Sequence, residues 1–192
     1  YLESLNLGFS RGDEPENVDK NFDIVCNTLG VKKENCVTLK QVHSTKIITA
    51  DESIKGMGFR KDINRIEADA FVTNKKGIVL VTFHADCVPL FFVDTENKAI
   101  GMAHSGWRGT VNRMGEVTLQ RMKEAFGTRP SDVWTAIGPS ICQDCYEVSE
   151  DVAQEFISAF EGRVDNRLLY RKENGKYQLN LWRANELVLL ES

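Results

Sequence analysis

Four short β-rich runs in the middle of the chain limit its possible folds more than any other feature. They cover residues 70–73, 78–83, 88–93 and 99–103, and turn-forming residues separate them. Helical patterns lie outside this block, over residues 13–30, 110–126 and 181–190, with a further helix after Ser149 and a further strand over 132–137. Strands grouped in the middle with helices around them predict an α+β fold of one domain, and not a regular strand–helix alternation.

The first predicted helix has a clear apolar face. Its apolar residues recur with helical spacing, at Val18, Phe22, Val25, Cys26 and Leu29. Asp13 is placed to cap the start of this helix, and Gly30 is placed to end it. We therefore expect Cys26 to be a core residue. The later stretch 51–67 is polar and contains glycines, so we expect it to be an exposed excursion.

Composition restricts the classes of function that this chain can have. Its 192 residues carry 24 basic and 28 acidic side chains, a formal charge of −4, so we do not expect nucleic acid as a partner. The longest apolar run, over 78–93, is interrupted by polar residues and is too short for a membrane helix. Five cysteines, an odd number, are typical of a reducing compartment. We therefore expect a soluble cytoplasmic protein, either a monomer or a homodimer.

A cysteine and a histidine stand at the ends of two neighbouring predicted strands. Cys87 precedes the run 88–93, and His104 follows the run 99–103. A turn near Asn97 would make these two runs an antiparallel pair. The pairing would bring the thiol and the imidazole together at one edge of the sheet.

The residues that follow His104 have two possible roles. Gly106 and Gly109 would let the backbone approach a ligand closely. The start of the predicted helix 110–126 favours an anion, and Arg108 adds a guanidinium suited to phosphate or carboxylate. The same residues are also typical of a strand-to-helix turn in which Trp107 packs in the core.

His43 is the third candidate ligand. A single histidine near a strand end is usually a packing or surface residue, but with Cys87 and His104 it would complete a set of two imidazoles and one thiolate. Three protein ligands with an open fourth position are typical of a catalytic zinc site. His84 would point to the other face of an extended strand, so we expect it to lie behind the ligands. Asp86 is the nearest carboxylate, and it could orient a ligand, carry protons or cap the bend.

Cys142 and Cys145 have the spacing of redox and zinc motifs. A structural zinc would need a second pair, for which Cys26 and Cys36 are the remaining cysteines. Because Cys26 is assigned to a helix core, we favour a simple loop here.

Several motifs together resemble the laccase-domain (YfiH-like) family. They occur in the family's order over nearly the whole chain, at residues 4–8, 12–13, 41–44, 67–70, 85–89, 104–109, 137–141 and 145–148. The resemblance implies an α+β fold in which mixed sheets pack between helices in an α/β/β/α arrangement. The family usually extends beyond both ends of this sequence. We therefore expect residues 1–192 to form a single laccase-like domain without its N- and C-terminal segments.

The resemblance also implies a site and an activity. It implies a zinc ion held by His43, Cys87 and His104, and a purine nucleoside phosphorylase that accepts adenosine, inosine and methylthioadenosine and also deaminates adenosine. The expected partners are these nucleosides and phosphate. In this scheme phosphate is bound by residues 108–109, Asp86 handles protons, and Asn6 contacts the nucleoside.

Three other functions remain open from the residues. Cys87 could be the nucleophile of a hydrolase or deamidase with His104 as its base. Copper could replace zinc, either in the polyphenol oxidoreductase chemistry of the family's older name or in an electron-transfer site with Met102 as axial ligand. Three histidines are too few for several coppers. A non-catalytic module with a structural zinc is the third possibility.

Overall fold

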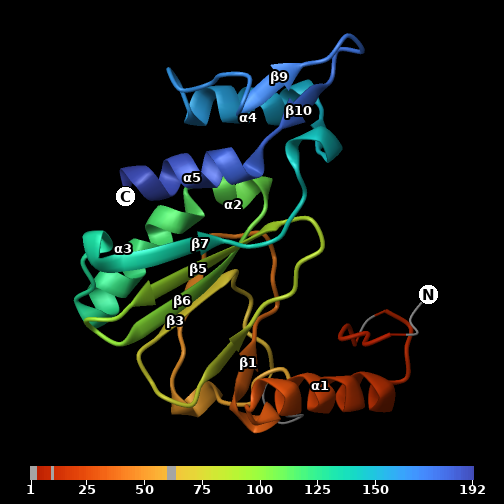
Figure 1. Ribbon diagram of the computed structural model, residues 1–192, viewed down its shortest axis with the longest axis vertical. Coiled ribbons are helices and arrows are strands. Elements are labelled where there is room, and N and C mark those ends of the chain that lie inside the picture. Colours follow the sequence, from red (N-terminus) through yellow and green to blue (C-terminus); the bar gives the residue numbers. More distant parts are fainter. Residues whose placement is uncertain (1–3, 10, 60–63) are drawn as a thin grey trace.

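A mixed five-stranded sheet forms the centre of the computed structural model, which describes residues 4–9, 11–59 and 64–192 (Figure 1). The strand order is β2-β3-β6-β5-β7. β2 and β3 are parallel, and the other neighbours are antiparallel. The strands are β2 (Ile47–Thr49), β3 (Ala70–Thr73), β5 (Val88–Asp94), β6 (Ala99–Ser105) and β7 (Val133–Ile137).

One face of this sheet packs against helices. α3 (Met114–Phe126) and α5 (Leu181–Glu191) cover it, and the short α2 (Trp107–Val111) lies beside them (Figure 1). Leu90 and Phe92 of β5 point into this core, whereas Phe91 and Val93, which alternate with them, are partly exposed. The alternation follows from the two-residue period of a strand.

The other face packs against a second, smaller layer of strands. β1 (Cys36–Thr38) pairs in parallel with β4 (Val79–Val81), and Val37 packs with Phe71 of the large sheet. α1 (Pro15–Leu29) lies outside this pair (Figure 1), where the Cys26 and Cys36 sulfurs are 3.8 Å apart. The order of layers is thus helix, two-stranded sheet, five-stranded sheet and helices, which confirms the predicted α+β arrangement.

A third sheet extends the core on the helical face. β10 (Tyr177–Leu179) lies between β8 (Glu147–Val148) and β9 (Leu169–Arg171), and α4 (Glu150–Ala159) packs against it. Phe156 and Phe160 are buried and stacked there. This sheet lies beyond α5 in Figure 1.

The prediction of one helix over 110–126 is wrong. The chain enters α2 directly after Gly106, leaves it at Asn112 and begins α3 at Met114. Arg113 between them has φ 58°, in the left-handed region, so the backbone cannot continue as one α-helix. Apolar spacing carries no information about such a break, because residues of both helices pack in the same core.

Smaller predictions about the first third of the chain also need correction. Glu14, not Asp13, is the N-cap of α1, although Asp13 Oδ1 accepts from the Glu14 N–H at 2.9 Å. Gly30 ends the helix in the left-handed conformation and Cys26 is buried, as predicted. Leu29 is 67% exposed. Met57 is fully buried within the stretch predicted to be exposed, where it fills the smaller core.

Within the described residues, no helix combines the length and the apolar character needed to cross a membrane.

Candidate metal centre

The β5–β6 pairing brings Cys87 and His104 to the same side of the sheet. Val88 lies opposite Ser105, and Pro89 lies opposite His104. One step beyond the strands, this register puts Cys87 opposite Gly106. Because side chains two residues apart share a face, Cys87 and His104 lie diagonally across the two chains. The predicted antiparallel approach of these residues is confirmed.

His43 comes from the loop between β1 and β2. Its backbone has φ 60°, a conformation that residues other than glycine rarely adopt. The Asp69 carboxylate accepts the backbone N–H groups of Val42, His43 and Ser44, at 2.6–3.2 Å. It also accepts the Ser44 hydroxyl at 2.8 Å. These bonds hold the loop in the strained conformation that directs the His43 ring toward Cys87.

The same carboxylate orients His104. Asp69 Oδ1 lies 2.9 Å from His104 Nδ1, and both side chains are buried. Burial opposes ionisation of Asp69, but the hydrogen bonds from His104 and Ser44 outweigh it and lower the pKa of this carboxyl. Burial lowers the pKa of His104 despite the nearby carboxylate. A neutral His104 that donates Nδ1–H to Asp69 leaves the Nε2 lone pair free for a metal.

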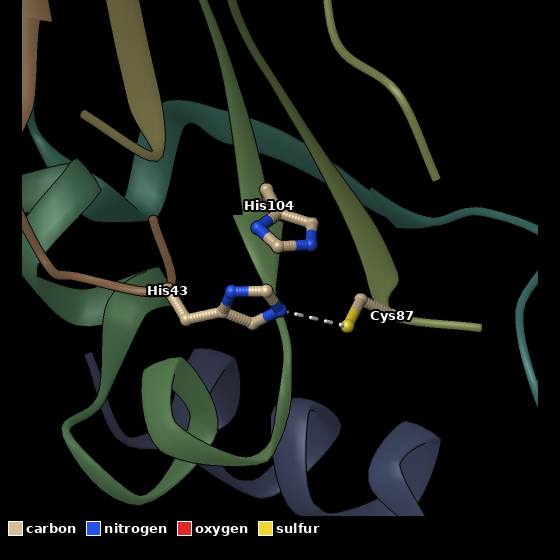
Figure 2. Close-up of side chains that lie close together, drawn as sticks. All are labelled: His43, Cys87 and His104. Atoms are coloured by element: carbon tan, nitrogen blue, oxygen red, sulfur yellow. Dashed lines mark hydrogen bonds between the residues drawn. The ribbon is translucent and has the colours of Figure 1, made fainter. Parts of the chain in front are cut away.

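The three candidate side chains can hold a metal ion together. The donor atoms of His43, Cys87 and His104 all lie within 4.8 Å of one another, and His43 Nε2 is 3.8 Å from Cys87 Sγ (Figure 2). In tetrahedral zinc sites, metal–nitrogen distances of about 2.0 Å and metal–sulfur distances of about 2.3 Å put two nitrogens and one sulfur roughly 3.3–3.5 Å apart. A small inward movement of the rings therefore suffices for coordination.

The electrostatics of Cys87 fit a bound cation. Burial raises the pKa of its thiol, and the nearby carboxylates of Asp86 and Asp69 raise it further. The thiol by itself is therefore protonated at neutral pH. A divalent cation between the donors would reverse this balance, because a coordinating thiol loses its proton.

Gly106 leaves the space that the ligands occupy. A Cβ at this position would lie 2.9 Å from Cys87 Sγ and 3.1 Å from His43 Cδ2. Only a residue without a side chain lets the backbone pass here without moving a ligand. The sequence indicated that the backbone comes close to a ligand at this glycine. In the structure, the groups that it approaches are the candidate metal ligands Cys87 and His43.

His84 lies beside the candidate ligands, with its ring centre 5.2 Å from that of His104, and it lines the same cavity as they do. Its Nδ1 lies 3.1 Å from the Cys87 carbonyl oxygen, and its Nε2 lies 2.9 Å from the Thr82 hydroxyl. Burial lowers the pKa of His84 to about 4, so the ring is neutral at pH 7. Both ring nitrogens contact protein groups, so His84 is not a member of the group that could hold a metal.

A cavity of about 790 Å³ opens beside the three donors. Its wall includes all three of them and the aromatic residues Phe9, Phe59 and Phe83. The buried Phe22 ring of α1 contacts these aromatic rings from behind, at centroid distances of 4.8–6.2 Å. Among the described residues, three cationic ones also line the cavity: Arg11, Lys40 and Arg65.

The other predicted site residues have varied positions. Asn6 and Asp86 line the cavity, but the Asn6 side chain also accepts from the Gly8 N–H and donates to the Asp13 carboxylate. Arg108 is exposed, with its guanidinium 4.3 Å from the centre of the Trp107 ring, and it does not line this cavity. Gly109 is buried within α2, so it does not stand at the helix start that we expected.

The residue that sequence reasoning missed is Asp69. We considered Asp86 as the carboxylate that orients a ligand, but Asp86 is exposed and Asp69 has this role. The signal was present, because residues 67–70 were among the motifs of the resemblance. Local sequence could not show that Asp69, directly before β3, lies beside both His43 and His104.

Comparison with known proteins gives a family match over the whole chain. The matching family model is described as multi-copper polyphenol oxidoreductase laccase, and it covers residues 1–192. The resemblance drawn from the motifs is therefore confirmed.

Curated relatives are enzymes of purine nucleosides by name. The purine nucleoside phosphorylase YlmD of Bacillus subtilis is 33% identical over 192 residues, which is 100% of this chain and 68% of the relative. A purine nucleoside phosphorylase of Deinococcus radiodurans is 38% identical over 96% of this chain and 66% of its own length. Adenosine deaminase RL5, from an unknown prokaryotic organism, is 34% identical over 84% of this chain and 62% of its own length. The chain thus spans about two thirds of these relatives.

Solved structures have the same fold. YlmD of Geobacillus stearothermophilus superposes with a TM-score of 0.90 at 31% identity, over 97% of this chain and 69% of that one. The hypothetical protein YfiH of Bacillus licheniformis gives a TM-score of 0.89 at 28% identity, over 97% of this chain and 70% of that one.

Proposed function

This chain belongs to the laccase-domain family, and from that premise we propose that it is a zinc-dependent purine nucleoside phosphorylase that also deaminates adenosine. The names of its relatives support both reactions. The observation that carries the proposal is the convergence of His43, Cys87 and His104 on the wall of one cavity. Phosphorolysis would join phosphate to the ribose C1′ as the purine leaves, giving the free base and ribose 1-phosphate.

Zinc fits the donor set better than a hard cation. Two imidazoles and one thiolate are typical zinc ligands, whereas magnesium and calcium prefer oxygen. His43, Cys87 and His104 would hold the ion and leave one position open. When bound, zinc supplies a Lewis acid and lowers the pKa of a coordinated water. Asp69 would keep both histidines in place and His104 in the correct tautomer.

The cavity has the size that a nucleoside needs, and its lining combines aromatic and polar side chains. Ligand pockets for small molecules are about 300–1,000 Å³ and mostly apolar, with a few polar groups. Phe9, Phe59 and Phe83 in its lining offer aromatic surface for the flat purine, and the three metal donors and Asp86 belong to the same lining. Asn6 also lines the cavity, and we propose that it contacts the nucleoside.

Phosphate could bind at either of two places. Arg108 and Gly109 remain our proposal for this role, and Asp86 for proton transfer. Arg65 is the alternative, because it lines the cavity and Arg108 does not.

Replacing the arginine that binds phosphate should raise the KM for phosphate without changing the zinc content of the protein. Initial rates of Arg108→Ala and Arg65→Ala with inosine and varied phosphate separate the two assignments.

The central experiment is Cys87→Ala. We expect it to lose zinc, measured by metal analysis, and to lose phosphorolysis of inosine and deamination of adenosine together. Cys142→Ala is the matched control, because it removes a thiol outside the cavity lining. Phosphorolysis retained by Cys87→Ala with a normal zinc content would refute the proposal.

The alternatives predict different chemistry at the same residues. A Cys87 nucleophile would give an activity that survives chelation and is abolished by thiol alkylation, but the raised pKa of this thiol disfavours it. A copper electron-transfer site would show an intense blue absorption after copper loading, yet Met102 packs against the smaller core. A structural zinc without catalysis would show full metal occupancy and no turnover.

The proposal also covers the cellular compartment, the partners and the oligomeric state of the protein. All five cysteines are free in the structure, which supports a reducing compartment such as the cytoplasm. We expect nucleosides and phosphate as partners, and a monomer or homodimer, which light scattering would distinguish.

A further inference from the structure

The Cys142–Cys145 turn is a second thiol site that the proposed function does not use. Cys142 is partly exposed and Cys145 is exposed, and both are free thiols. Neither lines the cavity beside the candidate metal centre. Cys26 and Cys36, the buried pair beneath α1, have their sulfurs 3.8 Å apart and lie in another layer of the fold. No second pair of thiols stands next to Cys142 and Cys145 in the described residues, so the turn has no four-cysteine zinc set.

The backbone of this turn is compatible with a disulfide between its two cysteines. The Cys145 N–H donates to the Cys142 carbonyl oxygen at 3.2 Å, which closes a single turn over the four residues. The first and last Cα atoms of such a turn lie less than about 7 Å apart. Disulfides form across Cα separations of about 4.4–6.8 Å. The two thiols also interact with each other, and each shifts the pKa of the other.

Hydrogen bonds hold this turn on several sides. Ile141 N–H donates to the Asp86 carbonyl oxygen at 3.1 Å, and the Gln143 side chain donates to the Asn166 carbonyl oxygen at 3.0 Å. The buried Gln178 side chain donates to the Asp144 carbonyl oxygen at 2.6 Å. These contacts tie the turn to the segment before β5 and to the third sheet. Little conformational entropy therefore remains to be lost when the two sulfurs join.

We propose that Cys142 and Cys145 form a reversible redox-active dithiol that exchanges with low-molecular-weight disulfides. The Cys142 thiolate attacks one sulfur of the small disulfide, forms a mixed disulfide and releases one small thiol. The Cys145 thiolate then attacks the Cys142 sulfur and releases the second small thiol. The protein is oxidised by two electrons, the small disulfide is reduced to two thiols, and an excess of thiol reverses the reaction.

Cys142 is the attacking residue for a physical reason. A hydrogen bond from the Cys145 thiol and backbone N–H groups of the turn lower the pKa of Cys142, whereas the pKa of Cys145 is raised. The thiolate is the nucleophile in exchange, so it forms first at Cys142. Cys145 is then the resolving thiol.

Glutathione and its disulfide test this inference on the full chain. The protein is equilibrated at several ratios of the two forms, quenched with acid, alkylated under denaturing conditions and digested with trypsin. Cleavage after Lys123 and Arg163 gives one peptide that contains Cys142 and Cys145 and no other cysteine, since Arg129 precedes a proline. At oxidising ratios we expect this peptide to carry no alkyl label and to weigh two hydrogens less than the unlabelled dithiol peptide. After reduction with dithiothreitol and renewed alkylation, it should carry both labels.

Two variants separate this inference from other thiol chemistry. Cys145→Ser lacks the resolving thiol, so we expect its peptide to keep one glutathione. Cys87→Ser should form the same disulfide as the wild type, because the pair does not need the metal-site thiol. The inference would be overturned if the wild-type peptide kept two labels at every ratio or carried two glutathiones. Loss of the disulfide in Cys87→Ser would also overturn it.

Discussion

At the scale of single residues, the Asp69 carboxylate does the most to shape the candidate metal centre. It accepts hydrogen bonds from the backbone of His43 and its neighbours and from the His104 ring. Two of the three candidate ligands therefore depend on one buried side chain. Gly106 complements it, because its missing side chain leaves room for the third ligand, Cys87, and for His43.

Asp69→Asn should weaken both folding and metal binding. An amide cannot accept from all these donors, so buried N–H groups would be left without partners, at a cost of about 1–3 kcal/mol in the free energy of unfolding. Loss of such a supporting carboxylate typically lowers metal affinity about 10–100-fold. Urea unfolding and zinc titration measure the two effects. Asp51→Asn is the control, since the Asp51 carboxylate accepts a similar bond from Ser53 in an exposed turn. If Asp69→Asn bound zinc as tightly as the wild type does, the role assigned to Asp69 would be contradicted.

Gly106→Ala should lower metal affinity with little loss of stability. Its φ of −73° suits alanine, so the backbone is not strained, but the new methyl group would push against Cys87 Sγ and the His43 ring. We expect zinc affinity to fall about 10-fold or more, by displacement of the ligands. Gly109→Ala is a matched control for zinc titration, because its added methyl would meet no atom closer than 3.5 Å. Equal losses of affinity in both variants would argue against a steric effect.

At the scale of elements, the β5–β6 hairpin brings Cys87 and His104 together. Its tight end is held by Asp94, which is 1% exposed and accepts from the Asn97 N–H at 2.9 Å and the Asn97 side chain at 2.8 Å. Lys98 in the same turn has φ 51°. The register that follows from this turn sets the diagonal approach of the two ligands at the other end of the hairpin.

Asp94→Asn should destabilise the protein in a pH-dependent way. Burial opposes ionisation of Asp94, but the hydrogen bonds from Asn97 outweigh it and lower the pKa below that of the unfolded chain. The stabilisation is therefore complete above about pH 4 and is lost as the pH falls through the lowered pKa. We expect the variant to lose about 1–3 kcal/mol of unfolding free energy at pH 7, and less near pH 3.

Urea unfolding at several pH values measures this difference. Glu96→Gln is the control, because Glu96 is exposed in the same turn and no change in stability is expected from it. A loss in Asp94→Asn that stays constant from pH 7 to pH 3 would mean that ionisation of Asp94 is not its source.

At the scale of the whole molecule, the candidate metal centre joins the His43 loop to the β5–β6 hairpin, whose Cys87 is 44 positions away in the chain. His43 lies in the loop after the two-stranded layer, whereas Cys87 and His104 belong to the five-stranded sheet. A bound ion would therefore link the two sheet layers. Such a link stabilises the folded chain, because the unfolded chain does not hold the three donors together.

Zinc should raise the unfolding temperature of the wild type. At a free concentration 100 times the Kd, one site adds about 2.7 kcal/mol to the free energy of unfolding. His43→Ala should lose most of this gain, and a chelator should remove it from the wild type. Thermal unfolding followed by circular dichroism gives the measurement. Magnesium serves as the control ion, and a wild-type unfolding temperature that does not respond to zinc would contradict the site.

The sequence by itself determined the order of the elements and the chemistry of the ligands. Two-residue and helical periodicities located the strands of the central block and α1, because burial of one face imposes those periods on local sequence. The Cys87–His104 approach followed from two adjacent strands and a short turn. The family followed from several motifs in a fixed order.

Only the tertiary structure decided the rest of the site. The break at Arg113, the position of Arg108 on the Trp107 ring, and the role of Asp69 depend on backbone angles and on contacts between distant segments. Local sequence carries the preference of a residue for burial, but not the identity of the group that it meets. The partner of His104 is 35 positions away in the chain, and only folding brings it within a hydrogen bond.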